Sequence, residues 1–246
     1  MIALYRLGFL ALLVLLWMVG AQAVGRNLIP TPGDTLAAAL EMIGDGRLAE
    51  ALAESLAVYL SGFAIAAVVG IASGVAMGMI APLGRTLDIY AFALAATPRV
   101  AFIPLIIVLL GLGLEAKVFI VFLGAVMPVL ITTYSGVKAA DAELIEMGRS
   151  VGAPGRRILL EIVLPGAVPF IVAGLRLGAT VGLINTVVAE LYTAVSGLGG
   201  LLALYGNTFR MAEYFVIVLC LAAIGVVVTE GLRLIESRLD RWRPHP

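Results

Sequence analysis

The sequence has almost none of the side chains that enzymes use for nucleophilic, acid–base or metal chemistry. Its 246 residues include one histidine, His245, and one cysteine, Cys220. A single cysteine can form neither an internal disulfide nor a cysteine metal cluster. A serine nucleophile needs a base beside it, and the only histidine, His245, is next to the last residue. The sequence contains no Gly-x-Ser-x-Gly elbow and no Gly-x-x-x-x-Gly-Lys-Ser/Thr phosphate loop. We therefore expect no catalytic residue, no metal site and no ATP hydrolysis by this chain.

Charged residues are also scarce. They make up 13% of the chain and sum to a net charge of zero, whereas hydrophobic residues make up 62%, with a mean hydropathy of +1.10. Soluble domains contain about a quarter charged residues. The sequence has no basic tail or stripe that would suggest nucleic-acid binding. This composition predicts a polytopic membrane protein.

Long apolar runs locate the expected membrane spans, because a helix needs about 20 apolar residues to cross the hydrocarbon core. Six runs fit this length: 7–25, 55–80, 89–112, 117–137, 167–190 and 213–233. The first run could instead be a signal peptide, since Arg6 precedes it and Ala21-Gln22-Ala23 closes it. We favour a span because the run is long enough to cross. The expected fold class is an all-α membrane protein, with residues 1–246 forming a single domain of six transmembrane helices.

Lysine and arginine residues set the predicted orientation, because cytoplasmic loops carry the excess of positive charge. With the N-terminus inside, ten basic residues fall on the inner side: Arg6, Arg85, Lys138, Arg149, Arg156, Arg157, Arg233, Arg238, Arg241 and Arg243. The outer side holds only Arg26, Arg47, Lys117 and Arg210. We therefore predict that both termini and the segment 138–165 are cytoplasmic.

Two segments outside the spans have their own patterns. In residues 27–54, Asp34 is expected to N-cap a short amphipathic helix that ends at Gly44-Asp45-Gly46, and we interpret this helix as lying on the outer membrane surface. Residues 191–212 include Ser196-Gly197-Leu198-Gly199-Gly200, which is too glycine-rich to continue a helix. A short re-entrant or surface turn is predicted there.

Glycines recur at four-residue spacing in the second and fifth spans. They are Gly70, Gly74 and Gly78, and then Gly174, Gly178 and Gly182. Such stripes let helix backbones approach closely in lipid. They predict tight helix packing, although surfaces that slide during a conformational change would use the same pattern.

The segment 138–165 predicts a short cytoplasmic helix with an exposed apolar face. From Asp141 onward, helical spacing gathers Leu144, Met147, Gly148 and Val151 on one side. Gly152, Pro154 and Gly155 stop this helix, and a second apolar face then precedes Pro165. From these residues alone, the helix could dock into a groove of a partner protein or lie on the inner membrane surface.

This segment resembles the EAA signature of the permease subunits of bacterial ATP-binding-cassette (ABC) importers. That signature is Glu-Ala-Ala, three residues, Gly, nine residues and Ile-x-Leu-Pro. The chain has Glu146-Met147-Gly148, Gly152 and Ile162-Val163-Leu164-Pro165 at the same spacing. Met-Gly replaces Ala-Ala. The resemblance extends along most of the chain and is greatest to the nitrate, sulfonate and taurine branch, at Leu28 to Pro32, Pro98 to Ala101, Gly111 to Gly113, Gly174 to Arg176 and Ser196 to Gly199.

The resemblance implies a type I importer permease in the bacterial inner (plasma) membrane. Two permease subunits, expected to be identical, would form the translocation path, and two cytoplasmic ATPase subunits would bind ATP and Mg²⁺. A periplasmic or tethered solute-binding protein would deliver the solute, and this chain itself would bind no cofactor. The segment 138–165 would hold the coupling helix between spans 4 and 5. The coupling residues implied are Leu144, Glu146, Met147, Gly148, Val151, Gly152, Arg156, Ile162 and Pro165.

Polar residues inside the spans are candidates for the path, because such residues are costly in hydrocarbon and face protein or water. Arg99 follows Pro98, where a broken helix frees backbone groups and a guanidinium could attract an anion. Thr186 and Glu190 share one helix face, with Asn185 beside them. We expect these four residues to line the path or its outer gate. The alternatives are a structural salt bridge or a snorkelling side chain for Arg99 and interhelical hydrogen bonds for the other three.

The resulting prediction is an importer permease for a small anion such as a sulfonate, taurine or nitrate. A different solute, such as a pyrimidine precursor, is the first alternative, because relatives of this branch also take up other small molecules. A secondary transporter driven by an ion gradient is the second alternative. It would be expected to show two comparable sets of spans with broken helices and no docking loop.

Overall fold

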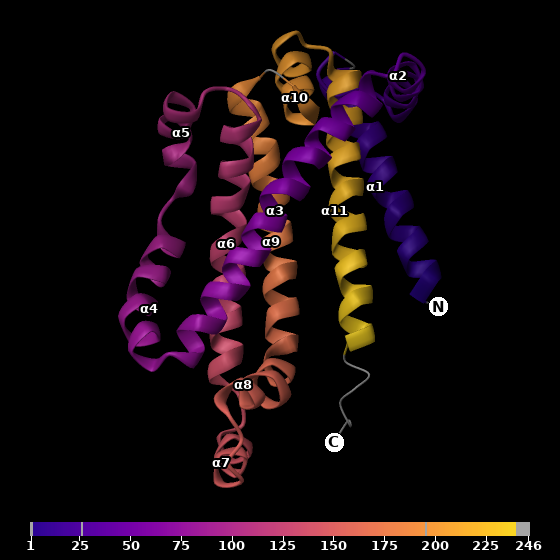
Figure 1. Ribbon diagram of the computed structural model, residues 1–246. Helices are drawn as coiled ribbons and strands as arrows, with labels where there is room; N and C mark the ends of the chain where they lie inside the picture. Colours follow the sequence, from indigo (N-terminus) through magenta and orange to yellow (C-terminus); the bar gives the residue numbers. More distant parts are fainter. Residues whose placement is uncertain (1, 26, 195, 240–246) are drawn as a thin grey trace. The chain divides into compact units, whose positions relative to one another are not determined.

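The computed structural model describes residues 2–25, 27–194 and 196–239. Within these ranges the chain forms helices and contains no strand (Figure 1), which confirms the predicted all-helical fold. Arg26, Arg241, Arg243 and His245 enter the sequence argument but lie outside the described residues. The contacts divide the chain into two units. Unit 1 contains residues 1–56 and 190–224, and unit 2 contains residues 57–189 and 225–246.

Five helical stretches are long and apolar enough to cross a membrane. They are Tyr5–Val24, Arg47–Met79, Leu114–Lys138, Gly155–Thr193 and Met211–Leu234. A sixth candidate is a broken pair, Ala81–Ala96 and Arg99–Leu110, whose two parts are bent by 82°. The break falls at Thr97-Pro98, because proline restricts the residue before it to extended backbone and has no N–H to donate. The described residues thus hold five or six candidate spans, in agreement with the sequence.

Unit 1 contains α1 (Ile2–Val24), α2 (Pro32–Gly44), α10 (Gly197–Asn207) and the first part of α11 (Met211–Leu239). It also contains the start of α3 (Arg47–Met79) and the end of α9 (Leu164–Thr193). Trp17 of α1 ties this unit together, since its Nε1–H donates to the carbonyl of Pro30 at 2.9 Å and its ring stacks on Phe215 with centroids 5.7 Å apart.

The start of α2 differs from the prediction in one residue. The N-cap is Thr31, and not Asp34, because the hydroxyl of Thr31 accepts the N–H of Asp34 at 3.1 Å. The Asp34 carboxylate in turn accepts the N–H of Thr31 at 3.2 Å, which completes a capping box. Pro32 starts the helix because its fixed φ already suits the first helical position. As predicted, α2 ends at Gly44, and Gly46 has a positive φ of +82°.

The predicted turn at residues 191–212 is wrong over residues 197–207, which form α10. Each glycine in a helix interior costs about 0.5–1 kcal/mol relative to alanine, so local preference disfavours this helix. Tertiary contacts override that preference. Gly197, Gly199 and Gly200 are all buried, and side chains from other helices of unit 1 accept the first backbone N–H groups of α10.

Unit 2 is built on close contacts of α6 (Leu114–Lys138) with α3 and α9. A Cβ at Gly62 would lie 2.6 Å from Cβ of Val121, and one at Gly70 would lie 2.9 Å from Cβ of Val129. Gly74 meets Thr133 and Gly78 meets Val137 in the same register, whereas Gly178 of α9 meets Val129 from another side. The glycine stripes therefore pack helices together, as the first interpretation predicted.

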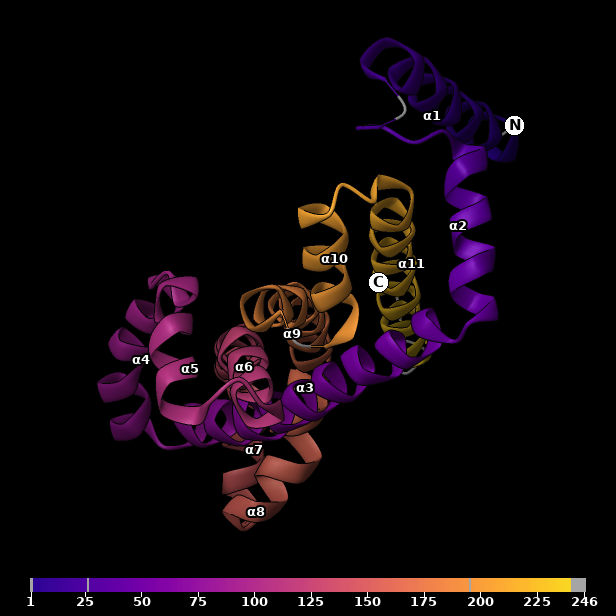
Figure 2. The same cartoon turned by 90° about the horizontal axis from the view of Figure 1, so that it is seen from above.

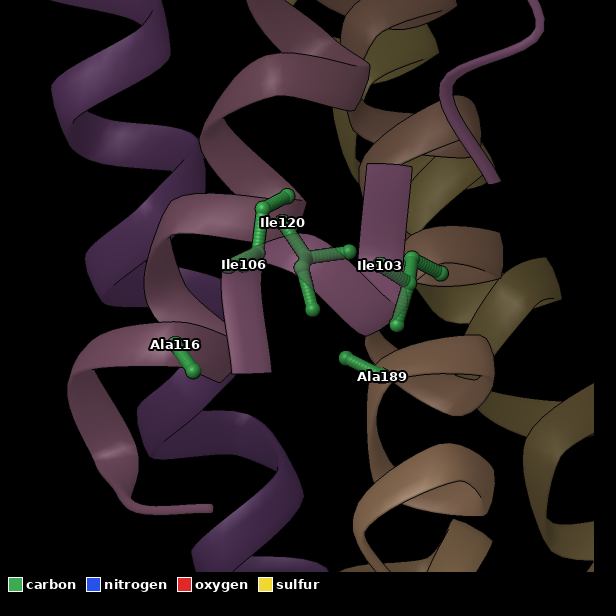
Figure 3. Packing of buried hydrophobic residues seen from close by; sticks show 5 residues of the cluster. All are labelled: Ile103, Ile106, Ala116, Ile120 and Ala189. Atoms are coloured by element: carbon green, nitrogen blue, oxygen red, sulfur yellow. The ribbon is translucent and has the colours of Figure 1, made fainter. Parts of the chain in front are cut away.

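The broken span packs beside α6 in both views (Figures 1 and 2). It consists of α4 (Ala81–Ala96), a 3₁₀ turn η1 (Arg99–Phe102) and α5 (Ile103–Leu110). Figure 3 shows how α5 is held: Ile103 and Ile106 pack against Ala116 and Ile120 of α6 and Ala189 of α9. The small alanines let the isoleucines approach, and this packing fixes the position of η1 next to α6.

Candidate coupling segment and intramembrane polar sites

The predicted coupling segment forms α7 (Ala142–Ser150), α8 (Gly155–Ile158) and a π-helical turn η2 (Leu159–Val163). Asp141 N-caps α7, because its carboxylate accepts the N–H groups of Glu143 at 2.9 Å and Leu144 at 3.3 Å. Three apolar side chains lie along one exposed face of α7 and its C-cap residue, Val151. The exposed fractions are 44% for Leu144, 59% for Met147 and 78% for Val151. We call these three residues the α7 stripe.

Gly152 ends α7 through a Schellman motif. The N–H of Ala153 donates to the carbonyl of Gly148 at 3.0 Å, and the N–H of Gly152 donates to the carbonyl of Arg149 at 3.0 Å. This geometry requires a left-handed residue, and Gly152 has φ +77°. The glycine of the EAA-like pattern therefore has a backbone role here: it turns the chain from α7 into α8.

Gly148, which helical spacing grouped with the α7 stripe, is buried at the edge of that face. A Cβ there would lie 3.3 Å from Cδ1 of Ile162 and 3.5 Å from Cγ1 of Ile158. Ile145 and Ile162 join a buried cluster around Ile158. Gly148 thus lets α7 pack closely on α8 and η2, and the exposed side chains of the α7 stripe remain available to a partner.

Pro165 accounts for the π turn that precedes α9. Proline has no N–H, so the ordinary bond to the carbonyl of Glu161 cannot form, and its ring would crowd that carbonyl. Instead, the N–H of Leu164 reaches back to the carbonyl of Leu159, five residues earlier. Pro165 itself is exposed. The Ile-x-Leu-Pro ending thus sets how α9 leaves the coupling segment.

Glu146 lies on the face of α7 opposite the stripe. Together with Arg149 and Lys138 it lines a cleft of about 900 Å³ between α7 and the ends of α3 and α6. Arg156 of α8 is exposed to solvent. The structure therefore divides the predicted coupling residues into an apolar outer face, a charged cleft face and a set of glycine and proline positions that shape the backbone.

Arg99 and Asn185 meet at Gly124 in unit 2. The Arg99 guanidinium donates to the carbonyl of Gly124 at 2.7 Å and to that of Ala95 at 3.1 Å. The side chain of Asn185 lies directly against Gly124, at the position where a Cβ would stand. The Asn185 amide donates to the carbonyl of Val181 at 2.8 Å. Arg99 thus links the broken span to α6, because it bonds one carbonyl of α4 and one of α6. The side chains of Arg99 and Asn185 are both half-buried.

Glu190 is fully buried and anchors the start of α10 in unit 1. Its carboxylate accepts the hydroxyl of Ser55 at 2.8 Å and the N–H of Gly199 at 2.8 Å. Ser55 accepts the N–H of Leu198 at 2.8 Å, and Glu54 accepts the N–H of Gly197 at 2.8 Å. These bonds satisfy N–H groups that a helix start leaves unpaired, and they place negative charge at its positive end.

Thr186, the fourth predicted path residue, is also buried. Its hydroxyl donates to the carbonyl of Gly182 in its own helix at 3.0 Å.

Sequence reasoning missed Gly124, Glu54 and the hydrogen-bonding role of Ser55. Glu54 and Ser55 carry no local signal, because their partners lie 135 to 143 residues away. Gly124 carries none because its role depends on an absent side chain. Within the described residues, no three His, Cys, Asp or Glu side chains gather to hold a metal ion.

Comparison with known proteins decides the family. Residues 66–241 match the model of the binding-protein-dependent transport system inner membrane component family. The chain belongs to this family. As a permease of this kind, it is a multi-pass membrane component of an ABC importer, and the predicted resemblance is confirmed.

Individual relatives agree with the family match. This permease is 36% identical to the protein MJ0413 of Methanocaldococcus jannaschii over 82% of this chain and 76% of that protein. It is 30% identical to the taurine transport system permease protein TauC of Escherichia coli K12 over 96% of this chain and 88% of TauC. A chain of the inward-facing MetNI methionine ABC transporter matches its fold with a TM-score of 0.66, covering 76% of this chain and 93% of that chain at 20% identity.

Proposed function

We propose that this permease couples ATP hydrolysis on partner subunits to the uptake of a small sulfonate-type anion. In this proposal two cytoplasmic ATPase subunits bind ATP and Mg²⁺, two identical permease chains enclose the path, and a solute-binding protein delivers the substrate. The chain itself has no catalytic role and binds no cofactor. The observation that carries the proposal is the α7 stripe, an exposed apolar face on a short helix whose capped ends fix its position.

The α7 stripe is large enough to contribute substantially to docking. Fully burying an aliphatic side chain is worth about 1.5–3 kcal/mol. The stripe residues Leu144, Met147 and Val151 are 44%, 59% and 78% exposed. Covering them in a partner groove would then contribute about 3–5 kcal/mol before the costs of association. The spacing of these residues, at positions i, i+3 and i+7, is typical of a helix that binds in a groove.

The contacts of α7 with other helices would carry its movement to the membrane spans. Glu146 and Arg149 line the cleft against the ends of α3 and α6, and the cluster around Ile158 joins α7 to the start of α9. A displacement of α7 by a partner would therefore be transmitted to the helices that form the spans. In thermodynamic terms, a nucleotide site on one subunit would share coupling free energy with a transport site on another.

The proposed substrate class rests on the taurine permease among the relatives, because taurine carries a sulfonate group. Arg99 is the cation that we assign to the path. Two of its N–H groups reach carbonyls of Gly124 and Ala95, and a guanidinium has five N–H donors. Asn185 lies beside it at Gly124. We assign Glu190, with Thr186 in the preceding turn, to the outer gate, where Glu190 fixes α10.

A matched pair of triple variants tests ATPase docking. The test variant replaces the α7 stripe with serine (L144S/M147S/V151S). The control replaces three equally exposed residues of α2 (L36S/L40S/I43S), which are 61–64% exposed. From the estimated stripe contribution, the test variant should bind the ATPase at least roughly 100-fold more weakly and should lose ATP-driven uptake. Membrane insertion should stay normal, and the control should keep full affinity.

Equal ATPase affinity in the two triple variants would refute the docking role of α7. Uptake that continues without any ATPase, driven by an ion gradient, would instead indicate a secondary transporter.

A single variant tests the substrate assignment. Arg99→Ala should reduce uptake of taurine while leaving basal ATP hydrolysis intact. An unchanged uptake rate would limit Arg99 to its structural bonds with the two carbonyls.

A further inference from the structure

The break in the broken span lies deep inside the membrane. Arg99 of η1 donates to the carbonyl of Gly124 on α6 at 2.7 Å. Gly124 is two residues from Val126, the middle residue of the candidate span Leu114–Lys138. At 1.5 Å per residue, Gly124 is about 3 Å from the centre of that span. The hydrocarbon core extends about 15 Å to either side of its centre, so η1 lies well within it.

The break leaves polar groups that hydrocarbon cannot satisfy. Among the described residues, the carbonyl of Thr97 accepts no hydrogen bond, because the N–H of Ala101 donates to Pro98 instead. The Arg99 guanidinium is half-buried, and its Nε–H donates to none of the described residues. An unsatisfied backbone group costs several kcal/mol in lipid, so irregular backbone at this depth must face protein or water.

One face of η1 is open, although the other is fixed. Val100 is 47% exposed, Phe102 is 46% exposed, and Ala101 between them is also exposed. The isoleucines that follow η1, Ile103 and Ile106, hold α5 against α6 and α9 (Figure 3). Packing within the chain thus positions η1 and leaves its other face uncovered, at the depth where lipid is excluded by the polar groups of the break.

Water reaches the centre of the bilayer only along a translocation path. Under the proposed function, on which this inference rests, two identical permease chains enclose one such path. Two identical chains that form a closed pair are related by a two-fold axis, and a single path shared by both lies on that axis. The break of each chain must therefore face the axis, and the η1 turn of one chain then faces the η1 turn of the other.

We propose that the η1 turns of the two permease chains face each other across the two-fold axis and form a constriction at the centre of the path. Val100 and Phe102 of both chains supply its apolar walls, and apolar constrictions close a pore by excluding water. The Thr97 carbonyl and the Arg99 guanidinium of each chain lie at its edge. The constriction is incomplete in one chain, because each η1 supplies only half of its wall.

Disulfide cross-linking tests whether the turns face each other. Cysteine replaces Val100, Ala101 or Phe102 in turn, in a Cys220→Ser background that removes the only native thiol. All three side chains are exposed or partly exposed, so the changes remove little packing. At least one variant of the complete transporter should form a disulfide-linked permease dimer on oxidation in its native membrane, because the bond requires two Cα atoms within about 7 Å. Identical residues meet in this way only beside the axis.

Two valines on other helices are the matched controls. Val68 of α3 is 69% exposed and Val227 of α11 is 70% exposed. Val68→Cys and Val227→Cys should give no linked dimer, because these side chains lie away from the axis. During turnover with ATP, a charged methanethiosulfonate reagent should modify the cysteines at 100–102, since the reactive thiolate forms in water. The same reagent should leave Val68→Cys unmodified.

Co-purification of two differently tagged permease chains separates the possible failures. If the chains co-purify but the η1 cysteines stay unlinked and unmodified, the facing turns are overturned while the proposed function stands. A linked dimer at Val68→Cys or Val227→Cys alone would also overturn them, because the axis would then lie beside another helix. Chains that do not co-purify would contradict the pair assumed in the proposed function, and the facing turns with it.

Discussion

The contribution of Glu190 to stability can be tested quantitatively, because its buried carboxylate accepts hydrogen bonds from more than one group at the start of α10. Glu190 accepts the Ser55 hydroxyl and the Gly199 N–H, both at 2.8 Å. Glu190→Gln keeps the shape of the side chain but replaces one carboxylate oxygen with an NH₂ group. One oxygen then remains for the Ser55 hydroxyl and the Gly199 N–H, and the NH₂ group must face one of these two donors. A hydrogen bond to a charged group is worth about 1.5–3 kcal/mol, and an unsatisfied buried donor costs about 1–3 kcal/mol. We expect Glu190→Gln to lower the free energy of unfolding by about 2–4 kcal/mol.

Ser55→Ala should have a similar effect, because Ser55 both donates to Glu190 and accepts the N–H of Leu198. The two changes remove the same bond, so the double variant should lose about 1–2 kcal/mol less than the sum of the single variants. At about 2–4 °C per kcal/mol for a chain of this size, the thermal midpoint should fall by roughly 4–15 °C in either single variant.

The assay is thermal unfolding of the purified permease in detergent. Thr208→Val is the control, since Thr208 is exposed at the C-cap of α10 and, among the described residues, its hydroxyl bonds only the carbonyl of Leu204, four residues earlier. Its midpoint should change little. A wild-type midpoint in Glu190→Gln, or strictly additive effects of the Glu190 and Ser55 changes, would refute the reasoning that Glu190 anchors α10.

Three further changes probe local geometry. Gly124→Ala places a methyl group on the Asn185 side chain and should destabilise the protein by about 1–3 kcal/mol; thermal unfolding should show that Asn185→Ala partly restores the loss. Gly152→Ala forces alanine to φ +77° at a cost of about 1–2 kcal/mol and should speed proteolysis of the coupling segment, whereas Gly155→Ala, with open space around it, should not. The Arg47 N–H, which donates to Asp45, holds the pKa of that carboxyl below its usual value. The Asp45 carboxylate therefore contributes stability above the ordinary aspartate pKa, and this stability is lost as the pH falls through the lowered pKa. The difference in thermal midpoint between wild type and Asp45→Asn should vanish in acid.

The elements that the sequence predicted correctly are those with a local physical cause. Long apolar runs predicted the spanning helices, because hydrocarbon requires every backbone group to be bonded within its own segment. Pro98 marked the break in the third candidate span, and the glycine stripes predicted where α3 and α9 approach α6. Gly152 marked the end of α7, because the left-handed backbone there excludes most other residues.

The parts that sequence reasoning missed depend on distant partners. Residues 197–207 are rich in glycine, and the helix that they form is stabilised by distant groups: Glu54, Ser55 and Glu190 accept its first N–H groups. Gly148 was grouped with the α7 stripe because spacing shows which residues share a face but cannot show which neighbour lies against a residue. At Thr31, proline in the first helical position moved the cap three residues before Asp34. In each case a contact or a backbone constraint outweighed the simple pattern.

Affinity purification of the tagged permease from solubilised native membranes tests the central claim most directly. Mass spectrometry of the co-purifying proteins should identify an ABC ATPase subunit, together with a solute-binding protein. The L144S/M147S/V151S variant should retain the second permease chain but lose the ATPase. Recovery of the permease without any ATPase, from membranes that actively take up the substrate, would contradict the account.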